Sequence, residues 1–140
     1  MLGIRLTNAA AAMELVRDPT QFEVIVTSNL FGDILSDLTA SLIGGMGLAP
    51  SANLNPETGR GLFEPVHGSA PNIAGKGIVN PLGAILTGAM MVSNLGDAEA
   101  AMRIEQAVIG AIRADECTPD LGGSLSTSEA GRAVLRRLHD

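Results

Sequence analysis

The chain has 140 residues, the length of one ordinary domain, and its 46% hydrophobic and 17% charged residues are typical of a folded globular protein. Its net charge of −6, without a cluster of Lys and Arg, excludes the usual nucleic-acid surface, which needs cations to neutralise phosphates. No apolar run is long enough to cross a bilayer, and the N-terminus lacks a signal-peptide pattern, so we expect no membrane partner. The single Cys117 cannot form an internal disulfide, which favours a cytoplasmic protein with one core.

The first half combines helix and strand patterns, which predicts an α/β fold rich in helices. Residues 9–17 are Ala-rich and helical, and residues 23–27 (EVIVT) form a β-branched run typical of a short buried strand. Apolar residues recur every three or four positions over residues 31–43, which predicts an amphipathic helix. Turn-forming residues indicate a loop over residues 48–61, followed by a short strand over residues 62–66.

The second half is mostly helical. Asn80-Pro81 has the pattern of an N-cap followed by Pro at the first helical position, opening a helix that runs to Leu95 and is stopped by Gly96. A second helix is expected from Asp97 to Ala114. Ser126 and Glu129 have the spacing of a capping box, which predicts a terminal helix over residues 130–138.

Asp33 and Asp37 are the first candidate ligands. They stand four residues apart on the 31–43 helix, so both carboxylates project from one face, and hard oxygen ligands favour Mg²⁺ or Mn²⁺. Asp33 would stand in the first turn of this helix, where the positive end of the helix dipole stabilises a carboxylate and so favours a cluster of carboxylates around a metal. The alternative is that two acidic side chains on an amphipathic helix simply face water.

The segment of residues 62–81, LFEPVHGSAPNIAGKGIVNP, is a candidate ligand-binding loop, because Gly and Pro pre-shape it and polar side chains punctuate it. His67 could hydrogen-bond or stack on an aromatic base, or pack within the loop. Glu64 could lie near a ligand's sugar or at a strand edge, and Lys76 could reach a phosphate or remain an exposed charge. Asn80 could contact a ligand, although its capping role already explains it.

Three motifs in this order resemble those of the β-decarboxylating dehydrogenases, which include 3-isopropylmalate, isocitrate, homoisocitrate and tartrate dehydrogenases. The motifs are TSNLFGDILSD (residues 27–37), GGMGLAPSANL (residues 44–54) and GLFEPVHGSAPNIAGKGIVNP (residues 61–81), and the similarity continues through TPDLGGSLSTSEAGRAV. The resemblance implies the isopropylmalate dehydrogenase-like α/β fold, C-terminal portion only. Residues 1–45 would end the family's dimerisation and metal-binding domain, and residues 46–140 would belong to its cofactor-binding domain.

The resemblance also implies a reaction and its ligands. The family oxidises a 2-hydroxy acid with NAD or NADP and then releases CO₂ through an enolate stabilised by Mg²⁺ or Mn²⁺. Asp33 and Asp37 would be metal ligands. The loop would hold the adenosine half of the cofactor. His67 and Asn80 would contact the adenine base, and Glu64 would lie toward the nicotinamide ribose. The other cofactor-binding residues would be Gly68, Ser69, Ala70 and Asn72.

The sequence departs from the family pattern in three ways. Ala9 stands where the family has a further metal-binding Asp contributed across a dimer. Asn72 stands where NAD-dependent members have an Asp for the adenosine ribose, which leaves NADP open because the charge that repels a 2′-phosphate is lost. The chain also contains no Tyr, and the family's substrate arginines and its acid–base Tyr and Lys lie upstream of the matched region.

Two interpretations remain open from the sequence. One is a fragment of an oxidative decarboxylase, incomplete as a catalyst alone, whose 2-hydroxy acid would be bound with a missing N-terminal half. The other is a non-catalytic subunit that binds cofactor or dimerises, since the family's subunit interface uses the helices at residues 9–17 and 31–43. The motifs fit several substrates of the family, and we place 3-isopropylmalate first because it is the commonest bacterial case.

Overall fold

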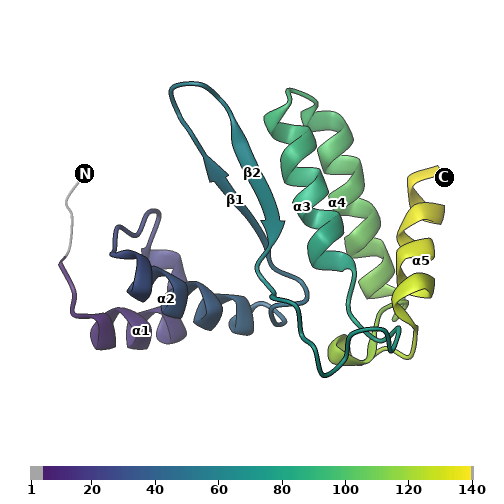
Figure 1. Cartoon of the computed structure of the whole chain (residues 1–140), viewed down its shortest axis with the longest axis horizontal. Coiled ribbons are helices and arrows are strands. Elements are labelled where there is room, and N and C mark those ends of the chain that lie inside the picture. The colour runs from purple at the N-terminus through teal and green to yellow at the C-terminus, as the bar shows by residue number, and fades with distance from the viewer. Residues whose placement is uncertain (1–4, 140) are drawn as a thin grey trace. The chain divides into compact units, whose positions relative to one another are not determined.

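The computed structural model describes residues 5–139, which form a helix-rich α/β fold as the sequence predicts (Figure 1). Within this part of the chain there are five α-helices, two short 3-10 helices and one two-stranded antiparallel sheet. The chain divides into two compact units, unit 1 (Met1–Ile43) and unit 2 (Gly44–Asp140). The length of the chain favours a single core, whereas the structure has two compact units.

Unit 1 contains helix α1 (Asn8–Arg17), the 3-10 helix η1 (Pro19–Gln21) and helix α2 (Asn29–Leu42). The Thr7 side chain caps α1 by accepting a hydrogen bond from the Ala10 backbone N–H. Both predicted helices are confirmed, although α2 begins two residues earlier than the apolar pattern indicates.

The strand predicted at residues 23–27 is wrong, because the described part of this segment contains no strand. Its side chains are also not buried: Val24 is 71% exposed and Val26 is 94% exposed. A β-branched run gains strand geometry only when a neighbouring strand supplies backbone hydrogen-bond partners. None of the described residues provides such a strand, so the propensity of the segment is not realised.

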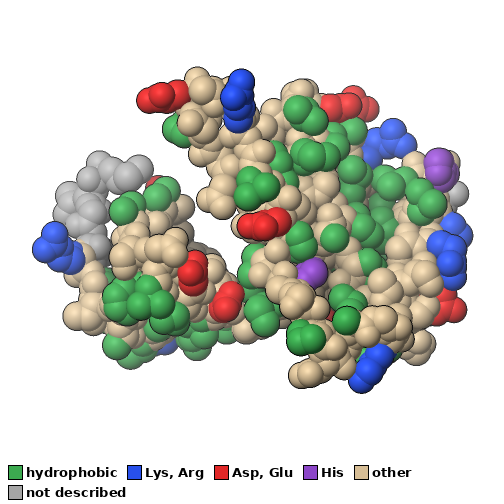
Figure 2. Space-filling model, viewed as in Figure 1, with side chains coloured by type: hydrophobic (Ala, Val, Ile, Leu, Met, Phe, Trp, Pro, Cys, Tyr) green, Lys and Arg blue, Asp and Glu red, His purple; other side chains and the backbone are tan. Residues whose placement is uncertain are grey.

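Unit 1 buries few side chains. Leu15, Leu35 and Ala40 are buried, whereas many large apolar side chains on both helices are exposed. Figure 2 shows hydrophobic side chains on the surface of this part of the chain. The exposed set on α1 and α2 comprises Met13, Val16, Leu30, Phe31, Ile34 and Leu42.

Unit 2 begins with a β-hairpin made of β1 (Pro50–Leu54) and β2 (Gly61–Pro65), paired from Pro50↔Pro65 to Leu54↔Gly61. The strand β2 is confirmed, but the prediction of a loop throughout residues 48–61 is wrong over β1. Asn55 makes the turn, because its side chain accepts hydrogen bonds from the backbone N–H groups of Glu57 and Thr58. Turn residues therefore occupy only the tip of the hairpin.

Three helices complete unit 2: α3 (Leu82–Asn94), α4 (Ala98–Arg113) and α5 (Thr127–His139), with the 3-10 helix η2 (Pro119–Leu121) before α5. The hairpin packs against α3, α3 against α4, and α4 against α5 (Figure 1). Their buried residues form one core cluster: Leu82, Ala107, Val108, Ala111, Ala133 and Val134.

The predicted stop of α3 and the predicted caps of α4 and α5 are confirmed, although α5 begins at Thr127, three residues before the predicted start. Gly96 adopts φ +101° after α3, a conformation that favours Gly. Asp97 caps α4 by accepting from the Ala100 N–H at 2.9 Å. Ser126 and Glu129 form the capping box of α5, since Glu129 Oε2 accepts from the Ser126 N–H at 2.8 Å. Among the described residues, no helix combines the length and the apolar character needed to span a bilayer.

Candidate functional site

The candidate cofactor site is built on the loop of residues 66–80, which leaves the hairpin and leads into α3. The Val66 N–H donates to the Ala49 carbonyl at 3.1 Å, which fixes the start of the loop beside β1. Glu64 lies just before it on β2, opposite Ser51, and is exposed. Its carboxylate is therefore open to an incoming ligand.

His67 is half-buried at the start of the 66–80 loop. Its ring Nδ1 lies 3.2 Å from the Gly68 carbonyl oxygen. A carbonyl oxygen only accepts hydrogen bonds, so Nδ1 carries the proton in this contact, and Nε2 of the neutral ring remains an acceptor. With Nδ1 bonded to the loop backbone, the ring thus leaves Nε2 as an acceptor for a donor on a ligand.

The middle of the 66–80 loop is a tight turn that starts at Ala70. Ala70 has φ +41°, a region that non-Gly residues rarely adopt and that occurs with some frequency at ligand sites. Its carbonyl accepts from the N–H groups of Ile73 at 3.0 Å and Ala74 at 3.1 Å, which holds the turn closed. Ser69, just before the turn, and Asn72, within it, are both exposed, so their polar side chains are accessible.

The end of the 66–80 loop is anchored to the N-terminus of α5. The Thr127 N–H donates to the Gly77 carbonyl at 2.8 Å, and the Thr127 hydroxyl donates to the Val79 carbonyl at 2.6 Å. Sequence reasoning assigned no role to Thr127, although it lies within the TSEAG segment of the family-like C-terminal motif. Together with the Val66 bond, this anchor leaves the loop attached at both ends.

Asn80 is buried, at 4% exposed, and its side chain is engaged within the protein. Its Oδ1 accepts from the Leu82 N–H at 2.9 Å, so the side chain does bond to the start of α3. The predicted positions are wrong by one residue, because Pro81 is the N-cap and Leu82 the first helical residue. The Asn80 Nδ2 donates to Asp120 Oδ2 at 2.8 Å. The structure therefore brings Glu64, His67 and residues 69–72 to the surface, whereas the Asn80 side chain points into the protein.

Asp33 and Asp37 lie on α2 in unit 1, and both are exposed. Their four-residue spacing places them on one helix face, as predicted. The expectation that Asp33 stands in the first turn is wrong, because α2 begins at Asn29 and has no acidic residue in that turn. Asp33 is thus one turn beyond the helix start, where the helix dipole contributes little.

The donor set for a divalent cation is incomplete within the described residues. No group of three or more His, Cys, Asp and Glu side chains there is arranged to hold a metal ion. Ala9, which lies in α1, contributes no ligand atom. The pair Asp33 and Asp37 fits the oxygen chemistry of Mg²⁺ or Mn²⁺, but further donors must come from outside these residues.

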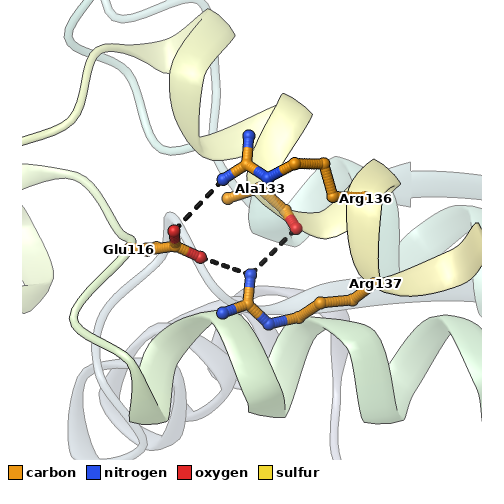
Figure 3. A network of polar contacts seen from close by, with 4 residues as sticks. All are labelled: Glu116, Ala133, Arg136 and Arg137. Carbon is orange, nitrogen blue, oxygen red and sulfur yellow. Dashed lines mark hydrogen bonds and ion pairs between the residues drawn. The ribbon is translucent and has the colours of Figure 1, made fainter. Parts of the chain in front are cut away.

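A separate polar network joins the α4–α5 connection to α5 (Figure 3). The Glu116 carboxylate accepts from Arg136 at 3.1 Å and from Arg137, and Arg137 also donates to the Ala133 carbonyl at 3.0 Å. The hydrogen bond from Arg137, together with the charges of both arginines, lowers the pKa of Glu116 below its ordinary value. Two guanidinium groups share one carboxylate, so the network links the α4–α5 connection to α5 and keeps one net positive charge.

Comparison with known proteins agrees with this arrangement of motifs. The sequence model of the isocitrate/isopropylmalate dehydrogenase family matches residues 7–134. A 3-isopropylmalate dehydrogenase of Zymomonas mobilis is 59% identical over 130 residues, which cover 92% of this chain and 37% of that enzyme. An isocitrate/homoisocitrate dehydrogenase of Thermus thermophilus is 57% identical over 127 residues, again covering 37% of that enzyme.

The fold agrees as well. The crystal structure of isocitrate dehydrogenase from Methylococcus capsulatus matches with a TM-score of 0.89 and 47% identity, over 95% of this chain and 40% of that one. The chain therefore spans less than half the length of these relatives. A match over almost all of its residues, in sequence and in fold, shows that the chain belongs to the isocitrate/isopropylmalate dehydrogenase family.

Proposed function

We propose that the chain supplies the C-terminal portion of an NAD(P)-dependent oxidative decarboxylase that acts on a 2-hydroxy acid. The relatives that support this proposal are named as 3-isopropylmalate, isocitrate and homoisocitrate dehydrogenases. 3-Isopropylmalate is the first substrate to test, because the relative that is 59% identical carries that name. The chain covers 37% of that relative, so the remaining substrate-binding and acid–base groups would come from the rest of an enzyme of this family.

The observation that carries the proposal is the doubly anchored 66–80 loop. An adenosine needs a flat contact for its base and polar groups for its ribose, and the loop offers the His67 ring and the exposed Ser69 and Asn72. With Nε2 free as an acceptor, His67 would accept a hydrogen bond from the exocyclic amino group of adenine. Glu64 would face the nicotinamide ribose, and the backbone of Gly68 and Ala70 would approach the cofactor closely.

Asn72 bears on the choice of cofactor. A carboxylate at this position would accept hydrogen bonds from both ribose hydroxyls and repel a 2′-phosphate, whereas the Asn72 amide can also donate and carries no charge. We therefore expect NAD to bind, and NADP to be rejected less strongly than by an enzyme with Asp at this position. Comparing NADH and NADPH affinities of wild type and Asn72→Asp measures this difference.

Asp33 and Asp37 would bind Mg²⁺ or Mn²⁺ in the complete enzyme, where the cation would withdraw charge from the substrate oxygen. Both carboxylates are exposed and neither forms an ion pair among the described residues; Asp33 Oδ2 accepts only a long hydrogen bond from Asn29 Nδ2 at 3.5 Å, so both carboxylates can accept a cation. A homodimer would bring in the missing donors, and the exposed apolar side chains of α1 and α2 support an interface there. With only two of its ligands in this chain, the metal should bind weakly in the absence of the remainder.

Calorimetric titration of the chain with NADH, and separately with Mn²⁺, tests the proposal. We expect NADH to bind and His67→Ala to weaken that binding, while the matched control His139→Ala, near the C-terminus, leaves it unchanged. Asp33→Asn together with Asp37→Asn should abolish the Mn²⁺ signal, whereas Glu105→Gln on α4 should not. If NADH gives no heat with the wild-type chain, the cofactor assignment is lost. If Mn²⁺ gives none even at concentrations that reveal weak binding, the metal assignment is lost.

A second function, a non-catalytic subunit that binds cofactor or dimerises, is favoured by Ala9 and Asn72. Co-expression with the N-terminal portion of the Zymomonas mobilis relative separates the two. Reduction of NAD in the presence of 3-isopropylmalate and Mn²⁺ would support the oxidative decarboxylase. Failure of the co-purified complex to turn over, with NADH binding retained, would support the non-catalytic subunit, and light scattering would report whether the chain dimerises.

A further inference from the structure

The end of the 66–80 loop meets two other segments at a polar junction formed by the buried Asn80 and Thr118 and the exposed Asp120. Thr118 is fully buried and Asn80 is 4% exposed. The Asp120 carboxylate bridges them: one oxygen accepts from Asn80 Nδ2 at 2.8 Å and the other from the Thr118 hydroxyl at 2.5 Å. Each of these residues therefore has its side-chain partner within the junction.

The bridge fixes the orientation of the Asn80 amide. A carboxylate only accepts, so the nitrogen of the amide must face Asp120, and the oxygen then faces the Leu82 N–H at 2.9 Å. Reversing the amide would place its oxygen against a carboxylate and its nitrogen against an N–H group. Because hydrogen bonds to an ionised group are stronger than neutral ones, Asp120 holds the amide more firmly than a neutral partner would.

The third segment is the turn before β1, where Gly47 lies against this junction. A Cβ on Gly47 would lie 2.9 Å from Asn80 Cβ and 3.2 Å from Asp120 Oδ2. The Gly47 carbonyl also accepts from the Gly83 N–H at 2.9 Å, so the turn is bonded to the first residues of α3. The position of Asn80 is thus defined from three sides: by α3, by the turn at Gly47 and by Asp120.

We infer that Asp120 is a positioning residue for the 66–80 loop: by holding the Asn80 amide, it keeps the end of the loop in the shape that receives the adenosine half of the cofactor. The inference rests on the proposed function. Asp120 itself acts through Asn80 and does not have to touch the cofactor. A loop fixed before binding loses less conformational freedom when the ligand arrives, so the effect should appear in affinity.

Four variants of the full chain test this role. Asp120→Ala removes the bridge and should weaken NADH binding about tenfold, the effect of losing one hydrogen bond to a charged group. Asp120→Asn keeps the shape, since its oxygen accepts from Asn80 and its nitrogen donates to Thr118, and should bind NADH nearly as well as wild type. Asn80→Asp sets two carboxylates against each other and should weaken binding, and combining it with Asp120→Asn should restore binding.

Amide hydrogen exchange measured by mass spectrometry gives a second readout that does not need the cofactor. Asp120→Ala should speed exchange in peptides that cover residues 77–82, whereas Asp120→Asn should not. Arg137→Met is the matched control, because it breaks the separate Glu116 network, lowers the melting temperature and should leave both NADH affinity and loop exchange unchanged.

The outcomes separate the inference from the proposed function. Unchanged NADH affinity and unchanged loop exchange in Asp120→Ala overturn the inference, as does a loss of affinity in Arg137→Met equal to that in Asp120→Ala. Absence of NADH binding by wild type overturns the proposed function. In that case faster loop exchange in Asp120→Ala still supports the positioning of the loop by Asp120, and unchanged exchange overturns it.

Discussion

Gly123 and Gly131 show how differently two glycines of unit 2 are constrained. A Cβ on Gly123 would lie 2.0 Å from the Cys117 carbonyl oxygen, so the backbone would have to move to accept a side chain. Gly131 lies inside α5, and a Cβ there would meet nothing within 4 Å. The close approach of two backbone segments thus requires glycine at position 123 and leaves position 131 free.

Replacing each glycine by alanine tests this difference. Gly123→Ala should lower the free energy of unfolding by about 1–3 kcal/mol, the usual cost of overpacking. Gly131→Ala should raise it by about 0.5–1 kcal/mol, because alanine is the better helix former. Urea denaturation followed by circular dichroism measures both changes, and equal effects of the two substitutions would contradict the geometry at Gly123.

Glu116 makes stability depend on pH. Its pKa is lowered by the Arg137 hydrogen bond first and by the charges of both arginines, so the folded state favours the ionised carboxylate. The stabilisation is fully present above the unfolded pKa of about 4.3 and is lost as the pH falls through the lower folded value. Glu116→Gln should therefore lower the melting temperature at neutral pH and leave it almost unchanged at strongly acidic pH.

The matched control for this prediction is Glu105→Gln, which changes an exposed carboxylate on α4. Its melting temperature should follow that of wild type throughout the titration. Glu129, whose pKa is lowered by its hydrogen bonds to Ser126, titrates in wild type and in both variants, so its contribution cancels in the comparison. A difference between Glu116→Gln and wild type that persists at acidic pH would mean that packing, not charge, is responsible.

Residue types in the candidate site could be read from the sequence, but their surroundings could not. The spacing of Asp33 and Asp37 predicts a shared helix face, and the Gly and Pro residues around His67 predict a shaped loop. The bridge from Asn80 to Asp120 joins residues 40 positions apart, and that contact depends on the tertiary fold that brings Asp120 to the residue before α3. No local pattern contains it.

At the scale of an element, the start of α4 depends on one side chain. Asp97 Oδ1 accepts from the Ala100 N–H, which satisfies one of the backbone donors left free at a helix start. Asp97→Ala should lower the free energy of unfolding by about 0.5–2 kcal/mol, whereas Asp97→Asn, which keeps the acceptor, should cost less. Chemical denaturation of the two variants measures the difference, and an equal loss in both would assign the effect to charge.

Helices were predicted more accurately than strands for a physical reason. A helix satisfies its hydrogen bonds within one segment, so α1 to α5 follow from periodicity and caps. A strand needs a partner. Residues 23–27 have the stronger strand propensity but no partner among the described residues, whereas residues 50–54 pair with residues 61–65 and form β1 despite their Pro and Asn.

At the scale of the whole chain, the two units differ in how much they bury. Unit 1 buries only three apolar side chains in its helices, Leu15, Leu35 and Ala40, whereas the helices of unit 2 share a continuous core. Segments with few buried contacts open more readily. Limited proteolysis with thermolysin, which cleaves before large apolar residues, should therefore cut first at the exposed residues 24–26.

Mass spectrometry of the early products checks this prediction. The expected products retain α3, α4 and α5 intact. Val108→Ala, which creates a cavity in the core of unit 2, is the comparison variant and should make the helices of that unit cleavable sooner. A first cut within α3 or α4 of the wild-type chain would contradict the difference in stability between the units.

The sequence by itself determined the helices, their caps, the family and the residue types available to a cofactor and a metal, because these depend on local spacing and on motifs. The tertiary structure decided which strands form, that Asn80 points inward, and that Thr127 and Asp120 hold the 66–80 loop. Those features depend on contacts between segments distant in the chain. The loop is thus encoded locally in its composition, and its shape is set by the elements packed around it.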